Sequence, residues 1–456
     1  MQRRNFLKSS GLAAGVALAG GLSAARSAHA AGSDVIKVGL IGCGGRGRGA
    51  LKDRLSAKDN VKIVAICDIF EKKAKSTAEA LAAMNDDRID LGKNIFWGFE
   101  AYKNVIDLCD QALIVTTPAF RPIHYLYAVQ KGKHVFMEKP CAIDVGGYKL
   151  ALEANKIADE KNLVVVVGYQ RHYQPVYQQL IEKIKEGAIG DVMYTRVYWN
   201  NDGIWERPRI EGMTEMEYQI NNWYHFNWLC GDGIVEQHCH NIDIANWIHC
   251  KGDFKGPLSH PVKVNAMGGR EVRKFPRFKN SGYRYDHYCC EFTYADGSQM
   301  FSQCRHQNNT WNKVSETVYG TNGSGAPGWL QDRSGKSVWK FDGSKPENQV
   351  PGPYQYEHHM QAKWIREGAA HNDGWFAAYS SMTSAFGRMA ACSGKELSWD
   401  EVVAKGRSEF PYADALAGKM NWDTVPPIVP DKEPPQQPAK GEFIYEQSVP
   451  VPGQWD

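Results

Sequence analysis

The chain has 456 residues, of which 43% are hydrophobic and 23% charged, with a formal net charge of +3. This composition is typical of a globular protein long enough for two domains. Residues 1–30 contain four basic residues and no acidic residue, so the remaining chain has a formal charge of −1. A nearly neutral chain gives no support for nucleic-acid binding or for electrostatic attachment to an anionic membrane, and we expect neither partner.

Residues 1–30 have the organisation of an export signal. Arg3 and Arg4 are followed by Phe-Leu-Lys, by the apolar run GLAAGVALAGGL and by an Ala-x-Ala cleavage site that ends at Ala30. The arginine pair resembles a twin-arginine motif, although Gln2 stands where that motif usually has Ser or Thr. The apolar run is too short to span a bilayer stably. We therefore expect a twin-arginine-type signal peptide, export of the folded protein by the twin-arginine translocase, a periplasmic location and no membrane anchor.

The chain has eleven cysteines and no C-x-x-C motif. Disulfide-stabilised folds are typically small and have regularly spaced cysteines. We therefore expect most of these cysteines to act as small buried apolar residues. Cys289 and Cys290 are adjacent on a predicted strand, so they should point to opposite faces and not pair with each other.

The segment VIKVGLIGCGGRGRG has the pattern of a dinucleotide-binding turn. A predicted buried strand at 35–41 runs into G-x-G-x-x-G from Gly42 to Gly47, then a helical segment at 50–57 and a second buried strand that ends at Asp68. The glycines permit a tight turn and a close approach of a pyrophosphate to the helix N-terminus. Asp68 would accept hydrogen bonds from the adenosine ribose. A carboxylate there repels a 2′-phosphate, which favours NAD over NADP.

Strands and helices continue to alternate after Asp68. We expect further strands at 111–118, 134–140 and 163–169, and helices at 78–85, 120–131 and 147–162. This alternation predicts a parallel, doubly wound sheet, which binds ligands at the carboxyl ends of its strands. Gly42, Thr116, Lys139 and Gly168 all lie at such ends. Lys139 should therefore lie where a nicotinamide ring and its substrate meet.

These motifs resemble one known family. VGLIGCGGRG, ALIVTTP, His124, KGKHVFMEKP and GYQRHYQP follow in the order and spacing of the glucose–fructose oxidoreductase, inositol dehydrogenase and MocA (Gfo/Idh/MocA) family. EGAIGDV, VYGTNGSG and AACSGKELSWDEV also look similar, so the resemblance covers roughly residues 35–405. It implies an α/β fold: a Rossmann domain with a doubly wound parallel sheet, then an α+β domain with a large, open, mostly antiparallel sheet. It also implies a homo-oligomer, a dimer or tetramer, because that sheet often forms the contacts.

GDGIVEQHCHNIDIANW, residues 231–247, is the second dense motif. By resemblance, Glu236 stands where the family usually has Asp, His240 at the following His and Asp243 at the last acid. Residues i and i+4 share one face of a helix, so Glu236 and His240 should be neighbours, and His238 should point away. Removing hydride from a carbinol requires that the hydroxyl lose its proton, and His240 is the expected base. Lys139 would donate to the same oxygen, and Glu236 would orient His240 or hold a neighbouring hydroxyl.

Other interpretations of these residues stay open. Glu236, His238 and His240 could be metal ligands, but on one helix the three would not converge, and we expect no metal. His240 could be structural and Lys139 a solvated turn residue. Twin-arginine export suits a protein that must load a cytoplasmic cofactor before export, so we expect the cofactor to be tightly bound.

The expected site residues fall into two further groups. The residues expected to bind the cofactor are Gly42, Gly44, Gly45, Arg46, Gly47, Asp68, Thr116, Thr117, Pro118, His124, Glu138 and Lys139. The residues expected on the substrate side are Arg171, Tyr173, Trp223, His225 and Asp243. Residues 199–230 predict an elaborated loop near the catalytic helix, whose aromatic residues could stack on sugar rings or fill a small core of the loop: Trp205, Trp223, Tyr224, His225 and Trp228.

The expected organisation follows. The signal peptide covers 1–30, the NAD-binding Rossmann domain 34–168 and the substrate and oligomerisation domain 169–424, and we leave open whether a C-terminal helix returns to the Rossmann domain. Residues 284–306 predict a hairpin around an Asp-Gly turn. Residues 425–456 contain eight of the 21 prolines and predict an extended or disordered arm.

The leading hypothesis is a periplasmic NAD(P)-dependent oxidoreductase that acts on a hydroxyl of a sugar, polyol or glycoside. The alternative is an NAD-dependent enzyme that cleaves glycosides by transient oxidation, elimination and re-reduction, as some relatives of the family do. A third hypothesis is a carbohydrate-binding protein with a vestigial Rossmann domain. The intact glycine motif, Asp68, Lys139 and His240 argue against the third.

Overall fold

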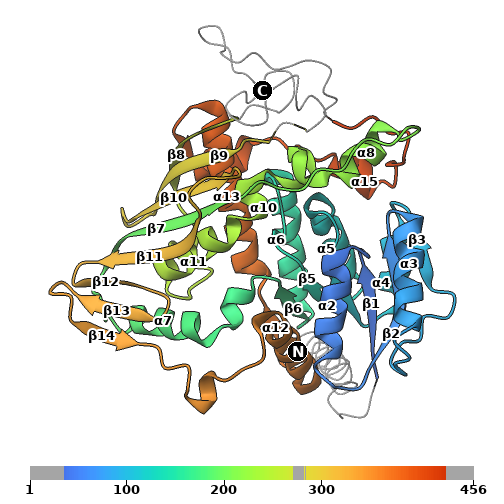
Figure 1. Ribbon diagram of the computed structural model, residues 1–456, viewed down its shortest axis with the longest axis horizontal. Coiled ribbons are helices and arrows are strands. Elements are labelled where there is room, and N and C mark those ends of the chain that lie inside the picture. The colour runs from blue at the N-terminus through green and yellow to red at the C-terminus, as the bar shows by residue number, and fades with distance from the viewer. Residues whose placement is uncertain (1–34, 271–281, 283, 428–456) are drawn as a thin grey trace, which may run out of the picture.

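The computed structural model describes residues 35–270, 282 and 284–427. The expected signal peptide and nearly all of the proline-rich arm lie outside the described residues. The described chain forms two sheets in two halves of the molecule, with the N-terminal sheet and its helices on the right of Figure 1 and the second sheet on the left. No helix in residues 35–270 and 284–427 is long and apolar enough to cross a bilayer.

The N-terminal sheet has seven parallel strands in the order β15-β6-β5-β4-β1-β2-β3. The strands are β1 (Ile36–Ile41), β2 (Val61–Asp68), β3 (Ile95–Trp97), β4 (Gln111–Ile114), β5 (His134–Met137), β6 (Val164–Val167) and β15 (His371–Asn372). Strand order reverses between β1 and β4, and the crevice at such a point is where doubly wound sheets bind ligands. The expected doubly wound parallel sheet is confirmed.

Helices cover both faces of this sheet because successive side chains of a strand point to opposite faces. Val38 and Leu40 of β1 pack in one cluster with Leu51, whereas Ile41 packs in another with Val105. The first face carries α2 (Gly45–Leu55), α3 (Glu71–Ala82) and α12 (Pro353–Glu367), and the second carries α4 (Ala101–Leu108), α5 (Arg121–Gln130) and α6 (Val145–Glu160).

Helix α12 comes from the C-terminal half of the chain and packs on α2 and β6. Its Gln361 is fully buried, donates to the carbonyl of Val135 over 2.7 Å and accepts from Gln111 over 2.6 Å. Gln111 in turn accepts from the buried Arg54 over 2.8 Å. Buried polar groups are stable only when they are hydrogen-bonded, so these contacts specify how α12 docks.

The second sheet has nine strands in the order β14-β13-β12-β11-β7-β10-β9-β8-β16. Only β7 and β10 are parallel neighbours, so the expected large, mostly antiparallel sheet is confirmed. The predicted hairpin is β9–β10, with Gly297 at φ +85° in its turn. The strands are β7 (Val192–Asn201), β8 (Lys263–Gly269), β9 (His287–Thr293), β10 (Gln299–His306), β11 (Lys313–Gly320), β12 (Gly323–Ala326), β13 (Trp329–Asp332), β14 (Ser337–Lys340) and β16 (Leu397–Ser398).

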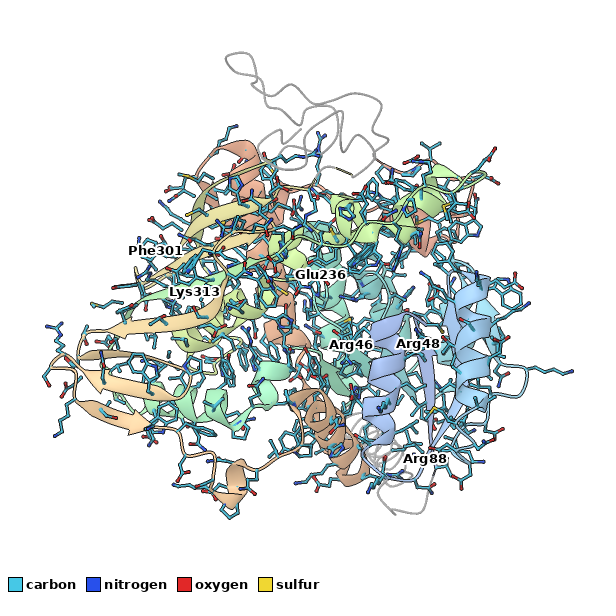
Figure 2. All side chains as sticks on the ribbon, viewed as in Figure 1. Arg46, Arg48, Arg88, Glu236, Phe301 and Lys313 are labelled. Atoms are coloured by element: carbon cyan, nitrogen blue, oxygen red, sulfur yellow. The ribbon has the colours of Figure 1, made fainter. Side chains whose placement is uncertain are left out.

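Helices cover one face of the second sheet. Met300, Ser302 and Cys304 of β10 are buried beneath them, whereas Phe301 between them is 38% exposed. Phe301 and Lys313 lie on the side of the molecule away from the Rossmann half (Figure 2). The covering helices are α10 (Gly233–Glu236), α11 (Cys239–Cys250) and α13 (Gly374–Ser393).

Short elements complete the fold. The α-helices are α7 (Pro175–Lys185), α8 (Glu215–Asn221), α9 (Asn227–Cys230), α14 (Trp399–Lys405) and α15 (Tyr412–Leu416). The 3-10 helices are η1 (Pro118–Phe120), η2 (Gln170–Tyr173), η3 (Trp223–His225) and η4 (Pro346–Asn348).

All eleven cysteines are free thiols, and only Cys289 is exposed. Cys290 is buried beside it, which confirms the expected burial and the opposite orientation of the pair.

Gly387 allows α13 to approach the second sheet closely. A Cβ at this position would lie 2.8 Å from Phe292 Cζ and 3.0 Å from Cys290 Sγ, two buried atoms of β9. Gly387→Ala should therefore lower the free energy of unfolding by roughly 1–2 kcal/mol, because overpacking outweighs the better helix propensity. Gly49→Ala in α2 is the control: its Cβ would come no closer than 3.4 Å to Arg46, so stability should rise slightly. Urea denaturation measures both, and a stabilised Gly387→Ala protein would contradict this packing.

Candidate active site

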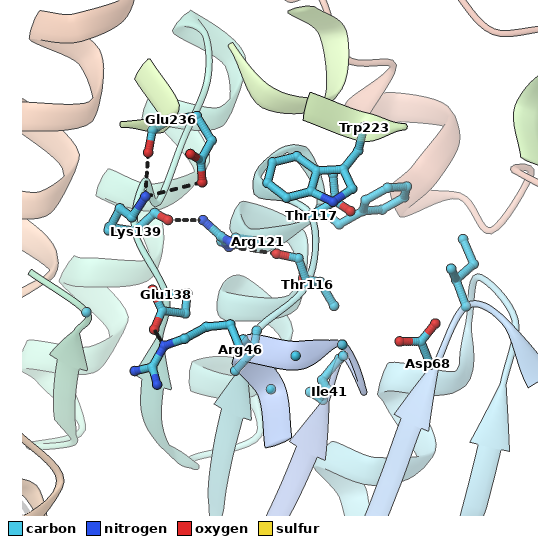
Figure 3. A pocket seen from close by; sticks show the side chains of 18 of the residues that line it. Ile41, Arg46, Asp68, Thr116, Thr117, Arg121, Glu138, Lys139, Trp223 and Glu236 are labelled. Carbon is cyan, nitrogen blue, oxygen red and sulfur yellow. Dashed lines mark hydrogen bonds and ion pairs between the residues drawn. The ribbon is translucent and has the colours of Figure 1, made fainter. Parts of the chain in front are cut away.

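A cavity of about 620 Å³ lies at the carboxyl ends of β1, β2, β4, β5 and β6. Its lining comes from the loops after these strands and, on the other side, from β7, η3, α10 and α11. Asp68 and Lys139 lie at opposite ends of this cavity, and Glu236 and Trp223 lie on the side away from the strands (Figure 3). Residues distant in the sequence therefore line one cavity between the two sheets.

The glycine motif forms the floor of the cavity, and its glycines differ in what surrounds them. Gly42 has φ +104°, a conformation that L side chains rarely adopt. A Cβ at Gly47 would lie 1.8 Å from the Gly42 carbonyl, whereas a Cβ at Gly44 or Gly45 would meet no atom within 4 Å. The open space above Gly44 and Gly45 adjoins the first turn of α2, whose N–H groups have no partner within the helix. This cradle fits the pyrophosphate of a dinucleotide.

Asp68 ends β2 beside the glycine motif and is 9% exposed. Its Oδ2 accepts from the Cys43 N–H over 2.8 Å, and its Oδ1 accepts from the Phe70 N–H over 2.9 Å. Each carboxylate oxygen has two lone pairs, so both oxygens keep capacity to accept from ribose hydroxyls. The carboxylate is thus held in place before any ligand arrives.

Arg46 and Glu138 line the cavity as an ion pair. Arg46 Nε lies 2.5 Å from Glu138 Oε1, and the same guanidinium contacts Asp53 at 3.0 Å and Glu357 at 3.4 Å. The Glu138 carboxylate packs on Gly168, where a Cβ would lie 2.9 Å from its Oε2. Glu138, which follows β5, therefore balances the charge of Arg46 in the glycine motif. Both side chains line the cavity.

Lys139 is tied to Glu236 across the two halves of the molecule. Its ammonium donates to the Glu236 carbonyl and lies 3.2 Å from Glu236 Oε1. Burial alone would lower the pKa of Lys139, but Glu236 raises it above the ordinary value. Lys139 therefore stays protonated and can donate hydrogen bonds. Arg121 holds the backbone here, donating to the carbonyls of Lys139 and Pro140, which are joined by a cis peptide.

His240 lines the cavity, but not on the continuous helix that the spacing predicted. Helix α10 ends at Glu236 and α11 begins at Cys239, with Gln237 and His238 between them. Within the described residues Glu236 makes no hydrogen bond to His240; it binds Lys139 instead. His238 points away as expected, with its Nε2 2.7 Å from the hydroxyl of Ser302.

The imidazole of His240 is neutral. Burial, with help from the positive charges of Lys139 and Arg171, holds its pKa well below the ordinary value. The ring lies against Trp199 and Tyr169, with centroids 6.0 and 5.8 Å away. Its Nδ1 is buried, which leaves Nε2 as the nitrogen available to the cavity.

Arg171 also lines the cavity, held by residues that sequence reasoning missed. It pairs with Glu316 of β11, which also accepts from Asn241 and from the hydroxyl of Tyr177 at 3.3 Å. Glu316 lies between Val314 and Val318 in the period-2 pattern of a strand, so an acid on an apolar face was the available signal. Arg121 carried no comparable signal.

Four expected site residues do not line the cavity. Tyr173 is at the far end of η2 from Gln170 and donates its hydroxyl to Asp373 over 2.6 Å. Asp243 lies 2.7 Å from the imidazole of His172 and accepts from Ser380 over 2.8 Å. The other two are the buried His225, whose Nε2 lies 2.6 Å from the Trp205 carbonyl, and Pro118, which begins η1.

The other expected cofactor residues do line the cavity. Thr116, Thr117 and His124 are among its walls, with His124 Nδ1 3.2 Å from the Thr116 hydroxyl. Burial, reinforced by Arg121, lowers the pKa of His124 to about 3, so this imidazole is neutral.

The aromatic residues of 199–230 divide between the two expected roles. Trp205 and Trp223 line the cavity. Tyr224, His225 and Trp228 are buried, and Trp228 donates from its indole nitrogen to Gln219 over 2.6 Å.

In residues 35–270 and 284–427 no group of three or more His, Cys, Asp or Glu is placed to hold a metal ion.

Gly44 and Gly47 should respond differently to the same substitution. Gly44→Ala should fold with wild-type stability but bind NAD at least tenfold more weakly, because its methyl group would occupy the open cradle. Gly47→Ala should lower the melting temperature, because its methyl group would collide with a backbone carbonyl 1.8 Å away. Calorimetry of unfolding and of NAD binding separates the effects, and equal NAD affinity in Gly44→Ala would contradict the assignment of the cradle.

Comparison with known proteins agrees with this geometry. Residues 36–169 match the profile of the oxidoreductase family with an NAD-binding Rossmann fold, Gfo/Idh/MocA. The chain is 27% identical over 220 residues to an inositol 2-dehydrogenase/D-chiro-inositol 3-dehydrogenase of Lactiplantibacillus plantarum, covering 47% of this chain and 52% of that protein. It is also 27% identical over 207 residues to an inositol 2-dehydrogenase of Ralstonia nicotianae, covering 44% and 56%. The chain thus spans about half the length of these curated relatives.

Solved structures share the fold over a longer stretch. A levoglucosan dehydrogenase in complex with NADH and levoglucosan superposes with a TM-score of 0.61 at 18% identity, over 80% of this chain and 99% of that one. A myo-inositol 2-dehydrogenase from Lactobacillus plantarum superposes with a TM-score of 0.57 at 18% identity, again over 80% and 99%. Residues 36–169 therefore match the NAD-binding Rossmann domain of the Gfo/Idh/MocA oxidoreductase family, and the chain shares its fold with these solved structures.

Proposed function

We propose that the protein is an NAD-dependent oxidoreductase that transfers hydride between a hydroxyl-bearing carbon of a sugar, polyol or glycoside and a tightly held nicotinamide cofactor. One observation carries the proposal: Lys139 and His240 line the same cavity as the glycine cradle and Asp68, and Lys139 and Asp68 lie at opposite ends of it (Figure 3). The inositol and levoglucosan dehydrogenases among the similar proteins support a carbohydrate or polyol as substrate.

The residues present fit NAD. The open cradle over Gly44 and Gly45 would hold the pyrophosphate, and Asp68 would accept from the adenosine ribose. Bound NAD supplies the hydride acceptor. Since the carboxylate of Asp68 would repel a 2′-phosphate, we propose NAD rather than NADP as the cofactor, to be tested by comparing the two dissociation constants.

The side chains at the other end of the cavity supply the proton chemistry. Neutral His240 accepts the hydroxyl proton at Nε2, and the ammonium of Lys139 donates to the same oxygen and stabilises its developing negative charge. Glu236 keeps Lys139 charged and positioned, which is a different role from orienting His240. Trp199 beside His240 offers a flat apolar face to the ring of a carbohydrate.

Lys139→Met and His240→Gln should each lower kcat by roughly 10²–10⁴-fold and still bind NAD, because both residues act on the reacting hydroxyl. Lys131→Met, an exposed lysine that pairs with Asp107, is the control and should keep wild-type activity. Steady-state kinetics and NADH fluorescence measure the two properties. Wild-type kcat in Lys139→Met would contradict the role of Lys139.

The pH dependence of kcat/KM follows from the same two groups. Protonation of His240 removes the base, and its lowered pKa should move the acid limb below 6.5, the ordinary imidazole value. Deprotonation of Lys139 removes the donor, and its raised pKa should move the alkaline limb above 10.5. An acid limb above pH 6.5 that disappears in His240→Gln would contradict a neutral base in the resting enzyme.

Retained cofactor provides a direct assay of the net reaction. Adding a neutral sugar or polyol to the purified protein should produce the absorbance of reduced nicotinamide. Release of an aglycone with no lasting reduction would instead identify glycoside cleavage by transient oxidation, elimination and re-reduction. A protein that neither contains nor binds a nicotinamide nucleotide would contradict both activities.

We propose that the protein is exported to the periplasm by the twin-arginine route, on the strength of residues 1–30. Expression in a Gram-negative host should give a periplasmic protein whose mass corresponds to a start at Ala31. The double substitution Arg3→Lys and Arg4→Lys should leave a full-length precursor in the cytoplasm. Equal export of both forms would contradict the route.

We propose a homo-oligomer in which the open face of the second sheet contacts another copy of the chain. Three exposed side chains support this: Met267 at 72%, Trp311 at 60% and Phe301 at 38%. Combining Met267→Glu with Phe301→Glu should convert an oligomer to a monomer in light scattering. Leu108→Glu, an exposed site on α4, should not. Unchanged mass in the double variant would contradict this interface.

A further inference from the structure

The structure assigns a second wall to the dinucleotide site: residues 202–214, here called the strap, hold the adenosine half of the cofactor through Trp205 and Arg207. This inference rests on the proposed function, because it presupposes a dinucleotide in the cavity. It goes beyond the Rossmann motif, which accounts only for contacts from the N-terminal domain.

The strap borders the end of the cavity that carries Asp68. It connects β7 to α8, and over its whole length it has neither helix nor strand. Trp205 and Arg207 line the same cavity as Asp68, Phe70 and Lys73. Arg207 lies close enough to Lys73 for its charge to act on that ammonium, where it adds to burial in lowering the pKa of Lys73. The strap therefore faces the adenosine-binding end of the Rossmann sheet.

Hydrogen bonds hold the backbone of the strap in place at Trp205 and at Arg207. The carbonyl of Trp205 lies 2.6 Å from Nε2 of the buried His225. The Arg207 N–H donates to Asn222 Oδ1 over 2.8 Å, and Asn222 Nδ2 donates back to the Arg207 carbonyl over 3.1 Å. Asn222 is 1% exposed and His225 is fully buried, so these anchors belong to the core. The strap is fixed rather than a loop free to drift from the cavity.

The two side chains have the chemistry of an adenosine site. The Trp205 indole is 40% exposed although it lines the cavity, and the Arg207 guanidinium lies 4.4 Å from its ring centroid. An indole and a guanidinium are the side chains best suited to stack on a flat base. Lys73 lies near Asp68 and Arg207 lies near Lys73, and these two positive charges suit a ligand that combines ribose hydroxyls with a diphosphate. The class of ligand is an adenosine diphosphate group.

The consequence is slow release of the cofactor. A ligand held on one side by the Rossmann domain and on the other by an anchored segment of the second domain must break both sets of contacts to leave. Most differences in affinity between related complexes lie in the dissociation rate. The strap thus provides a structural reason for tight cofactor binding.

The test measures dissociation of NADH from the purified full-length mature protein. Stopped-flow fluorescence after mixing with excess NAD gives the rate for wild type, Arg207→Ala, Trp205→Ala and Trp205→Phe. Arg209→Ala is the matched control, since its side chain lies on the same strap but pairs with Glu215 at 2.6 Å and covers Tyr218. Arg207→Ala and Trp205→Ala should release NADH at least roughly tenfold faster. Trp205→Phe should stay near wild type because it keeps an aromatic face, and Arg209→Ala should match wild type.

Nucleotide fragments locate the contact. ADP-ribose, which lacks nicotinamide, should bind Arg207→Ala more weakly than wild type by the same factor as NADH, whereas nicotinamide mononucleotide should bind both proteins equally. Wild-type NADH release in Arg207→Ala, or a loss confined to nicotinamide mononucleotide, would overturn the assignment. If wild type itself binds no NADH, the proposed function fails; if wild type binds NADH and Arg207→Ala does not differ, the strap assignment alone fails.

Discussion

The ion pair between Lys139 and Glu236 is the contact on which the site depends. Lys139 follows β5 of the parallel sheet, and Glu236 ends α10, which packs beneath the second sheet. A lysine buried this deeply would lose its charge without a partner, because burial disfavours the ammonium. Glu236 supplies both a carboxylate and a backbone carbonyl. One interaction therefore keeps the donor charged and joins the two halves of the molecule where the reaction is proposed to occur.

The same principle of paired charge extends along the cavity. Arg46 is balanced by Glu138, and Arg171 by Glu316, so each of these cations already has a carboxylate partner. His240 stays neutral chiefly because it is buried, and the charges of Lys139 and Arg171 further disfavour a positive charge on its ring. The part of the cavity around Lys139 and His240 has internally paired charges, a neutral base and the apolar face of Trp199, so it suits a neutral polyhydroxylated substrate better than an anionic one. Its selectivity would come from hydrogen bonds to hydroxyl groups.

The C-terminal half of the chain also completes the N-terminal half. Helix α12 packs on α2, β15 adds an edge strand beside β6, and Asp373 accepts the hydroxyl of Tyr173. In the other direction, the strap crosses to the adenosine end of the cavity. Each half therefore contributes structure to the other, and the cavity is a product of their junction.

Local sequence patterns were sufficient to predict most of the parallel sheet and its glycine cradle. Continuous apolar runs that end in glycine, an acid or, for β4, Thr-Thr-Pro predicted β1, β2, β4, β5 and β6. The glycine spacing predicted the cradle, because these features depend on near neighbours in the chain. The prediction of one helix through Glu236 and His240 was wrong, since a periodic pattern does not show the break at Gln237 and His238. Tyr173 was expected at the cavity from its position after a strand and from the family resemblance, and Asp243 from the resemblance, but they contact Asp373 and His172 instead.

The sequence by itself determined the parallel sheet, its dinucleotide turn and the identity of Lys139 and His240 as the residues to examine. Only the tertiary structure decided which groups contact the charged residues of the cavity. Glu236 pairs with Lys139, Glu138 with Arg46 and Glu316 with Arg171, and the strap lies opposite Asp68. The physical reason is that buried charges and enclosed surfaces are satisfied by whichever groups lie nearest in space. In this chain those groups come from segments about 90 to 150 residues away along the backbone.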